Sequence, residues 1–260
     1  MGPALLYLAQ ALNCDLLHDN LEDHLADEAP AELPSGPDMN ALQSNSPLIV
    51  YVDIKSPYAF VAIRQTLELE ASLGLRFDWR PVTLDIPSYL GSARKSAGKV
   101  VESNRSASQW SSVKYAYRDA RRYAERQGYK LYGTEKIWDS SLANIAIMWI
   151  TSKARDRLAA YFEVVYPKFW IRSLDIEDPK VITQCLADAG APTNGFRDFL
   201  AGDGRRQHDE LQSQLHPAGI YGVPTYVIDD KVFFGREHLP WIAWCLRGKH
   251  GPAPDIAYGL

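Results

Sequence analysis

Cysteine is scarce in this sequence of 260 residues, which contains only Cys14, Cys185 and Cys245 and no close pair. A disulfide framework is therefore not expected, and a reducing compartment fits better. Long apolar runs are also missing, since none approaches the roughly 20 residues that span a bilayer. The apolar residues 4–9 lack the basic start of a signal peptide. We expect a soluble, cytoplasmic protein without a membrane partner.

Strong net charge is absent as well. The formal charge is −4, which gives no electrostatic reason to expect nucleic acid as a partner. No glycine-rich phosphate loop and no nucleophile elbow occur. Cys14, His18 and His24 follow one another closely but lack a convincing fourth ligand, so we expect no metal. A chain of this length buries enough surface to fold without disulfides or a structural metal.

Residues 1–46 differ in composition from the rest and are predicted to form a leader and a linker. Leucine and alanine recur at helical spacing over residues 4–17, which is typical of a short amphipathic helix. An acidic stretch follows, and then a segment rich in proline, glycine and serine from Pro30 to Pro47. Three interpretations of the leader stay open: a cap on a surface, a dimerisation element or a disordered tail.

Residues 47–86 carry the pattern of a βαβ unit. The apolar run 48–54 predicts a buried strand. Residues 57–73 have helical spacing and end at Gly74, and glycine is favoured just past a helix C-terminus. Residues 76–82 alternate and predict a second strand. A strand, a helix and a strand in this order normally form a parallel, right-handed unit.

A long helical block separates this unit from a second group of strands. Residues 87–215 have a mostly helical pattern, residues 216–250 return to strands and a final helix, and residues 251–260 form a tail. Residues 223–235 predict a hairpin that turns at two aspartates. The order βαβ, helical block, ββα predicts an α/β protein with a thioredoxin-like fold and an inserted α-helical domain. The helices expected in the block cover residues 113–127, 139–157, 158–171, 178–189 and 194–201.

Ser56 stands at the end of the first predicted strand, directly before Pro57. Serine followed by proline is favoured as the N-cap and first residue of a helix, so a purely structural role explains the pair. The same position suits chemistry, because a helix N-terminus favours an anion such as a thiolate. A hydroxyl there can donate a hydrogen bond to a bound thiol and lower its pKa. It cannot form a mixed disulfide, so dithiol redox chemistry is not expected at this position.

Pro224 lies within Gly222-Val223-Pro224-Thr225, at the start of the returning strand. Proline removes a donor from the ladder and belongs at the first residue of a strand or at an edge, which is one interpretation. The other is a cis-proline whose preceding residue, Val223, offers its backbone N–H and C=O to an extended, peptide-like ligand. Few X-Pro bonds are cis, and the sequence leaves both interpretations open.

The two motifs together resemble the DsbA-like thioredoxin family. The resemblance rests on Ser56-Pro57-Tyr58, on Arg80-Pro81-Val82, on Gly222 to Thr225 and on Phe234-Gly235. It covers residues 48–247, and within the family the sequence is most similar to 2-hydroxychromene-2-carboxylate isomerases and kappa-class glutathione transferases. Further similarity occurs in the helical block, at residues 141–144 and 175–179.

This resemblance implies that glutathione is the cofactor. Ser56 would lie beside the glutathione sulfur, and Val223 would pair through its backbone with the cysteinyl part, next to a cis Pro224. The turn after the second hairpin strand holds the γ-glutamyl end in these relatives, which assigns that role to Arg236 and Glu237.

A helix within the block carries polar residues along one face. Lys114, Tyr115, Asp119 and Arg122 follow at short helical spacings, which is typical of an ion-paired helix surface. The resemblance implies instead that this helix lines the cleft facing the serine. Lys114 and Tyr115, together with Tyr58 in the turn after the serine, are then the candidates to contact a small-molecule substrate.

The leading hypothesis from the resemblance is a glutathione-dependent isomerase that acts on an unsaturated, aromatic-derived acid, or a kappa-like glutathione transferase. A homodimer is expected, because such relatives are commonly dimers. A second hypothesis is a non-catalytic binding or scaffold protein with a thioredoxin fold. A protein disulfide oxidoreductase ranks third, because residues 56–59 contain no cysteine. Cys185 and Cys245 fall in apolar helical patterns, where buried, inert thiols are expected.

Overall fold

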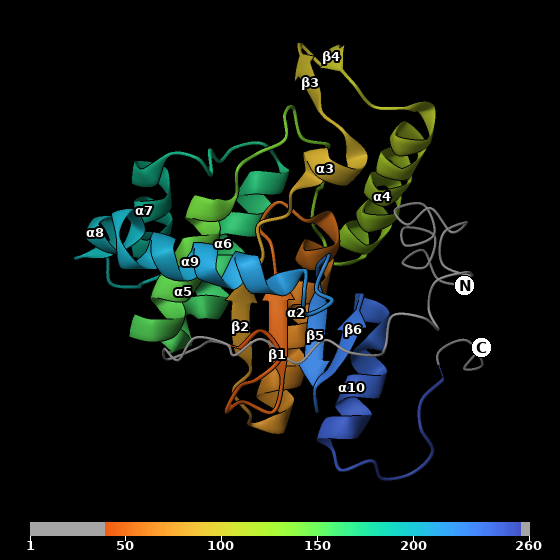
Figure 1. Ribbon diagram of the computed structural model, residues 1–260, viewed down its shortest axis with the longest axis vertical. Helices are drawn as coiled ribbons and strands as arrows, with labels where there is room; N and C mark the ends of the chain where they lie inside the picture. Colours follow the sequence, from red (N-terminus) through yellow and green to blue (C-terminus); the bar gives the residue numbers. More distant parts are fainter. Residues whose placement is uncertain (1–39, 256–260) are drawn as a thin grey trace, which may run out of the picture. The chain divides into compact units, whose positions relative to one another are not determined.

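A four-stranded mixed sheet lies at the centre of residues 40–255, the part of the chain that the computed structural model describes (Figure 1). Its strands are β1 (Ile49–Val52), β2 (Asp78–Pro81), β5 (Thr225–Ile228) and β6 (Lys231–Phe234), in the order β2-β1-β5-β6. β1 pairs in parallel with β2 and antiparallel with β5, and β5 pairs antiparallel with β6. This is the sheet of the thioredoxin-like fold that the sequence predicts.

The βαβ unit forms where the sequence predicts it. β1 is buried along its whole length, as its uninterrupted apolar sequence indicates. α2 (Pro57–Leu73) begins after Ser56 and ends at Gly74, whose φ of 62° is a left-handed conformation that glycine adopts readily. Paired residues such as Val50 and Trp79 define the parallel register of β1 and β2. The unit therefore places the N-terminus of α2 just beyond the carboxyl end of β1.

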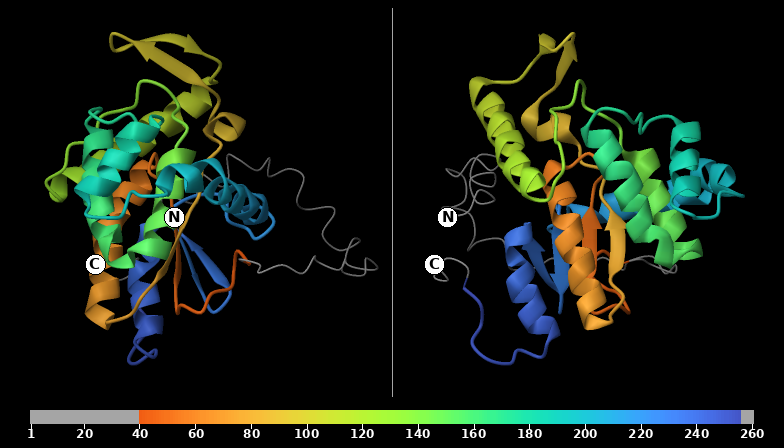
Figure 2. Two further views of the ribbon diagram at one scale, coloured as in Figure 1. Left: turned by 90° about the vertical axis from the view of Figure 1, so that its left-hand side faces the viewer. Right: turned by 180° about the vertical axis from the view of Figure 1, so that it is seen from behind.

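The C-terminal hairpin turns at two aspartates. Asp229 and Asp230 have φ angles of 50° and 59°, the left-handed pair that a two-residue hairpin turn needs. The chain then passes through the short helix η3 (Arg236–His238) into α10 (Leu239–Leu246). α2 and α10 lie on the same face of the sheet (Figure 2). This arrangement completes the predicted ββα half.

The insertion between the two halves is mostly helical. The C-terminal part of α4 (Ala107–Arg126) contacts α2. Arg64 Nη1 donates to the Gln127 carbonyl (3.2 Å), and Gln127 Nε2 donates to the Val61 carbonyl (2.8 Å). α5 (Ser141–Lys153) packs against β2, an edge strand of the sheet (Figure 1). The other helices of the insertion are α3 (Ile86–Leu90), η2 (Arg155–Arg157), α6 (Leu158–Trp170), α7 (Pro179–Asp188), α8 (Phe196–Ala201) and α9 (Asp203–Leu215).

A two-stranded hairpin in the insertion was not among the predicted elements. β3 (Ala93–Ser96) and β4 (Lys99–Ser103) pair antiparallel around Ala97 and Gly98, which both have positive φ. Every residue of β4 is exposed. Polar residues predominate in both strands, so the alternation that signals a half-buried strand is missing from the sequence.

Residues 40–46, which the sequence assigns to the linker, pack on the sheet. Arg80 is 5% exposed and donates from Nη1 to the Asn40 carbonyl (2.8 Å) and from Nη2 to the Gln43 carbonyl (2.7 Å). Tyr51 Oη donates to the Ala41 carbonyl (2.6 Å). The described body of the chain therefore begins at residue 40, ahead of the boundary that composition suggests.

Some predictions fall outside the described residues: the helix over residues 4–17, the linker up to residue 39, the cluster of Cys14, His18 and His24, and the end of the tail at 256–260. Within residues 40–255, no group of three or more His, Cys, Asp or Glu side chains is placed to hold a metal ion. None of the helices in that range has both the length and the apolarity that crossing a membrane requires.

Candidate active site

Ser56 caps the N-terminus of α2. Its Oγ accepts a hydrogen bond from the Ala59 N–H (3.2 Å), and Pro57 follows at the first turn of the helix. The backbone of Ser56 is extended, with φ −87° and ψ 120°, as is typical of an N-cap. The structural role that the sequence suggests for Ser56 is therefore present. The residue is 4% exposed, so its hydroxyl is largely shielded from water.

Val223 and Pro224 lie beside this cap. The peptide bond between them is cis, and both residues are buried. Ser56 Oγ donates a hydrogen bond to the Val223 carbonyl at 3.4 Å, which is long for such a bond. No hydrogen bond among residues 40–255 engages the Val223 N–H. The structure thus brings three of the predicted site residues together, with the main chain of Val223 facing the serine.

Buried polar side chains hold the loop that precedes Ser56. Asp53 is fully buried, and its Oδ1 accepts from the Lys55 N–H (3.2 Å) while its carbonyl accepts from the Ser56 N–H (3.0 Å). Asn144, near the N-terminus of α5, is also fully buried, and its Oδ1 accepts from the Ile54 N–H (3.3 Å). The N–H groups of Ile54, Lys55 and Ser56 are therefore all paired, which fixes the position of Ser56.

Tyr58 connects the first turn of α2 to the insertion. Its Oη donates to Asp119 Oδ2 in α4 (3.3 Å). The Asp119 side chain is 7% exposed and forms an ion pair with Arg122 (Oδ1 to Nη1, 3.5 Å). The Asp119–Arg122 pair is the part of the predicted ion-paired face that forms, and its buried member, Asp119, contacts the residue two positions after Ser56.

Lys114 and Tyr115 lie outside this contact. Lys114 is exposed, and Tyr115 is 42% exposed. No side-chain hydrogen bond or ion pair within the described range joins either residue to Ser56 or Tyr58. Their contact with substrate stays a prediction, and Asp119 is the residue through which α4 reaches the Ser56 turn.

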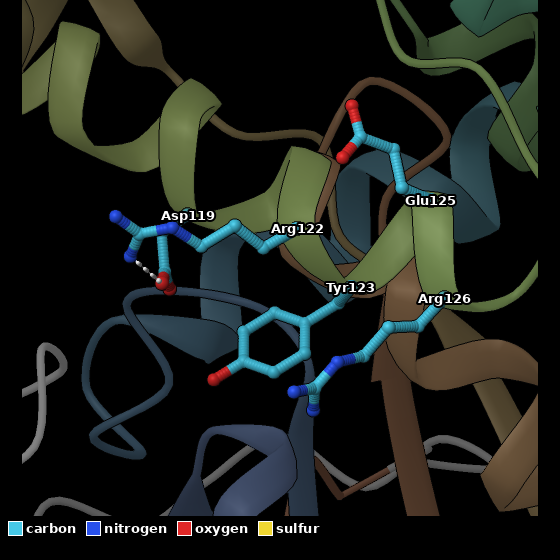
Figure 3. A pocket seen from close by; sticks show the side chains of 5 residues that line it. All are labelled: Asp119, Arg122, Tyr123, Glu125 and Arg126. Atoms are coloured by element: carbon cyan, nitrogen blue, oxygen red, sulfur yellow. Dashed lines mark ion pairs between the residues drawn. The ribbon is translucent and has the colours of Figure 1, made fainter.

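α4 also borders a hollow of about 520 Å³ (Figure 3). Two carboxylates and two guanidinium groups give the wall a mixed charge. The Arg236 guanidinium, from the turn after β6, lies 3.5 Å from the centroid of the Tyr123 ring. The turn predicted to bind cofactor therefore reaches the helix that forms this wall. The lining residues are Asp119, Arg122, Tyr123, Glu125 and Arg126.

Glu237 folds back within its own turn. Its carboxylate lies against the Cα of Gly235, where an added Cβ would overlap it. Gly235 has a φ of 109°, which also favours glycine. Burial raises the pKa of Tyr226 in β5, while Arg236 lowers and Glu237 raises this pKa. Arg236 and Glu237 thus both lie near β5. The Arg236 side chain contacts Tyr123, whereas the Glu237 side chain lies against Gly235.

Asp53, Asn144 and Asp119 are the site residues that the sequence analysis did not select. A signal for Asp119 exists, because Ala116, Ala120 and Ala124 recur every four residues and are all buried, and Asp119 is adjacent to that stripe. Asp53 follows an apolar strand without a break, and a carboxylate in that position is buried with it. The partners of these residues are distant in sequence, so their roles required the structure.

The fold and the site together define a class of protein: a thioredoxin-like domain with a helical insertion, whose first helix begins at a serine that faces a cis-proline segment. The sequence profile of the DSBA-like thioredoxin domain matches residues 47–244. The chain therefore belongs to the DSBA-like thioredoxin domain family.

Three proteins that are similar in sequence carry the name 2-hydroxychromene-2-carboxylate isomerase. The 2-hydroxychromene-2-carboxylate isomerase of Sphingobium xenophagum is 24% identical over 197 residues, covering 74% of this chain and 93% of that protein. The protein of the same name from Pseudomonas putida is 25% identical over 193 residues, covering 73% and 88%. A solved structure of a 2-hydroxychromene-2-carboxylate isomerase has a TM-score of 0.60 at 21% identity, covering 78% of this chain and 94% of that one. The structural likeness shows the shared fold.

Proposed function

We propose that this protein is a glutathione-dependent isomerase of the 2-hydroxychromene-2-carboxylate type. The observation that carries the proposal is the contact of the Ser56 hydroxyl, at the N-terminus of α2, with the Val223 carbonyl before cis-Pro224 (3.4 Å). The name shared by the relatives supports the reaction class. A cytoplasmic location and a homodimer belong to the proposal as its expected context.

The groups around Ser56 suit the thiol of glutathione. Bound glutathione would supply a thiolate that adds reversibly to an unsaturated substrate. The partial positive charge at a helix N-terminus favours the thiolate over the thiol. Because the Ser56 O–H is held only by a long bond to the Val223 carbonyl, it is free to turn and donate to a sulfur. A hydrogen bond to the anionic form lowers the pKa of the thiol.

Val223 supplies the main-chain groups that would hold the peptide part of glutathione. Its carbonyl accepts only the long bond from Ser56, and no described residue engages its N–H. An extended ligand can pair with both groups as an added strand does. Arg236 and Glu237 would hold the far end, and the contact of Arg236 with Tyr123 (3.5 Å) restrains the guanidinium on that side.

The wall of α4 is the proposed binding surface for the acid substrate. The Arg122 side chain is 62% exposed, and a guanidinium can bind a carboxylate through two parallel hydrogen bonds. Tyr58 and Asp119 hold that part of the wall at the first turn of α2. Lys114 and Tyr115 would extend the surface by one helical turn. Catalysis would then consist of positioning the acid against the thiolate and stabilising charge.

Glutathione titration by calorimetry, combined with the absorbance of the bound thiolate against pH, tests the proposal. Ser56→Ala removes the hydroxyl at the site, and Ser106→Ala is the matched control because Ser106 caps α4. Each variant loses an N-cap and about 1 kcal/mol of stability. Only Ser56→Ala is expected to raise the pKa of the bound thiol and weaken binding. Absence of binding by the wild type at millimolar glutathione rejects the cofactor, and equal behaviour of the two variants rejects the role of Ser56.

The burial of Ser56, which is 4% exposed, favours a second candidate: a non-catalytic binding protein. Turnover assays separate the possibilities. Isomerisation of a 2-hydroxychromene-2-carboxylate with glutathione present supports the isomerase. Conjugation of chlorodinitrobenzene without isomerisation supports a kappa-like transferase. Glutathione binding without either reaction supports the binding protein.

A further inference from the structure

A chain of buried and partly buried hydrogen bonds runs from α9 to the loop that carries Ser56. His208 in α9 is 3% exposed, and its Nε2 lies 2.8 Å from Thr83 Oγ1. Thr83 Oγ1 accepts from Asn144 Nδ2 at 2.9 Å, and Asn144 Oδ1 accepts from the Ile54 N–H at 3.3 Å. Four segments that are separate in the sequence are thus linked through side chains behind the candidate site.

Asn144 is the branch point of this chain. Its Nδ2 lies within hydrogen-bond distance of four acceptors but carries only two hydrogens. Thr83 Oγ1 is the nearest of them at 2.9 Å, and Asp53 Oδ1 is further away at 3.2 Å. A change in the acceptor strength of the Thr83 hydroxyl would therefore redistribute the hydrogens of Asn144 among these acceptors. The hydrogen bonds of Asn144 with Asp53 Oδ1 and with the Ile54 N–H would change as a result. The other two acceptors are the Val82 carbonyl and Ser140 Oγ.

The partners of His208 assign its tautomer. Because Thr83 Oγ1 already accepts from Asn144, its own hydrogen is available to His208 Nε2. The Nδ1–H then donates to Asp209 Oδ1 at 2.8 Å. With Nδ1 protonated, the neutral form of the imidazole has an unprotonated Nε2 that accepts from the Thr83 hydroxyl. Protonation of Nε2 would make it a donor to Thr83 and would force the Thr83 hydroxyl to turn.

We infer that His208 is a positioning residue for Ser56, acting through Thr83 and Asn144 and holding the Ser56 loop in place only while its imidazole is neutral. The connection to turnover rests on the proposed function. The connection to the geometry of the loop does not, because it concerns the protein without any ligand.

The charged groups around the imidazole come from two segments. Arg205 and Asp209 lie on α9 itself, and Asp139 lies in the segment before α5. Burial is the largest influence and lowers the pKa of His208, Arg205 lowers it further, and Asp209 and Asp139 oppose both. The net lowering keeps the imidazole neutral at neutral pH, and the loop is expected to loosen only in acid.

NMR of the full-length protein without glutathione tests the inference. The His208 imidazole and the backbone amides of Ser56 and Ala59 are followed while the pH is lowered from neutrality. We expect the two amides to shift with the midpoint of the His208 imidazole in the wild type. In His208→Gln the step should vanish, because the glutamine Oε1 accepts from Thr83 and does not titrate. His216→Gln, an exposed position just after α9, is the matched control and should retain the step.

A second pair of variants covers the case in which His208→Gln does not fold. Thr83→Ser keeps the hydroxyl and should keep the step, and Thr83→Val should abolish it. The inference is overturned if the Ser56 and Ala59 amides stay unmoved while His208 titrates. It is also overturned if the step survives in His208→Gln or Thr83→Val, or if the imidazole stays neutral down to acid unfolding.

If the isomerase activity is found, the pH dependence of turnover gives a separate readout. The acid limb of kcat should follow the His208 midpoint in the wild type and move or disappear in His208→Gln, with KM for the acid substrate unchanged. A wild type that binds no glutathione would reject the proposed function, and the amide titration would still decide the role of His208.

Discussion

The hydroxyl of Ser56 donates to the carbonyl of Val223, a residue 167 positions later in the chain, at 3.4 Å. The bond joins the helix N-terminus of the βαβ half to the start of the ββα half. The insertion lies between these halves in sequence, so the site forms only when both halves share one sheet. A bond of this length is weak, and a ligand that offers a better acceptor to the hydroxyl or a better donor to the carbonyl can displace it.

Tyr58 and Asp119 are predicted to be energetically coupled. Tyr58→Phe removes the hydrogen bond from Tyr58 Oη to Asp119 Oδ2 (3.3 Å), and Asp119→Asn weakens it by removing the charge of the acceptor. In a double-mutant cycle by urea unfolding, we expect a coupling of about 0.5–1.5 kcal/mol, as for an ordinary side-chain hydrogen bond. The cycle of Tyr117→Phe with Thr134→Val, a 3.1 Å pair, calibrates the method. Additive effects of Tyr58→Phe and Asp119→Asn would contradict the contact.

The sequence predicts most of the elements because their signals are local. The buried strand β1, the serine cap, the terminating Gly74 and the two-aspartate turn each follow from residues that are adjacent in the chain. The succession of these local patterns along the chain also predicts the order of the two halves. These features predict that Ser56 lies at a helix N-terminus and that Val223 and Pro224 lie at the start of the returning strand.

The sequence does not predict two kinds of feature: an exposed hairpin without an apolar pattern, and contacts between residues that are distant in the chain. The β3–β4 hairpin is exposed and has little apolar alternation, so no periodicity marks it. Residues 40–46 join the sheet through main-chain carbonyls that accept from Arg80. Every residue has such a carbonyl, so the sequence does not indicate these contacts. Likewise, the resemblance selects Lys114 and Tyr115 on the polar face of α4, whereas the structure buries Asp119, which contacts Tyr58 in α2.

The described cysteines are predicted to differ in reactivity. Burial raises the pKa of the Cys185 thiol to about 11, so only about one molecule in a thousand carries the thiolate at pH 8. Cys245 in α10 is half-buried. Alkylation followed by site-resolved mass spectrometry should modify Cys245 well before Cys185, and denaturant should make the rates similar. Rapid alkylation of Cys185 in the folded protein would contradict this burial and would reopen a redox role.

Gly222 is predicted to tolerate no side chain. A Cβ there would overlap the Phe234 ring, and overpacking of this kind costs about 1–3 kcal/mol. Gly222→Ala should therefore lower the free energy of unfolding, and Phe234→Leu should recover part of the loss in the double variant. Gly133→Ala is the control, because its Cβ would meet only Lys95 Nζ at 3.6 Å. Equal stabilities of the two alanine variants would refute the close contact.

The stability of the protein is predicted to fall in mild acid because of His208. Its pKa in the folded state lies below the ordinary value of 6.5, chiefly through burial. Between that folded pKa and 6.5 the unfolded chain binds more protons, so the free energy of unfolding decreases as the pH falls. Urea unfolding at several pH values should show a shallower decrease for His208→Gln than for the wild type. His216→Gln should match the wild type, and identical slopes for all three would exclude His208 as the source.

Arg236 is predicted to contribute to cofactor affinity beyond its contribution to stability. Its guanidinium lies 3.5 Å from the centroid of the Tyr123 ring, and Arg64 makes a similar contact of 4.8 Å with Tyr129. Arg236→Gln and Arg64→Gln should each cost about 0.5–1 kcal/mol of stability, as expected for a cation–π contact near the surface.

Arg236→Gln and Arg64→Gln should differ in their dissociation constants for glutathione. Arg236 belongs to the turn proposed to hold the γ-glutamyl end, so Arg236→Gln should raise the dissociation constant of glutathione. Arg64 lies on the contact between α2 and α4, where its Nη1 donates to the Gln127 carbonyl, and Arg64→Gln should leave that constant unchanged. Tyr123→Leu adds a further distinction, because it frees the guanidinium without removing its charge. If the contact with Tyr123 restrains Arg236 for binding, Tyr123→Leu should weaken glutathione binding less than Arg236→Gln but more than Arg64→Gln.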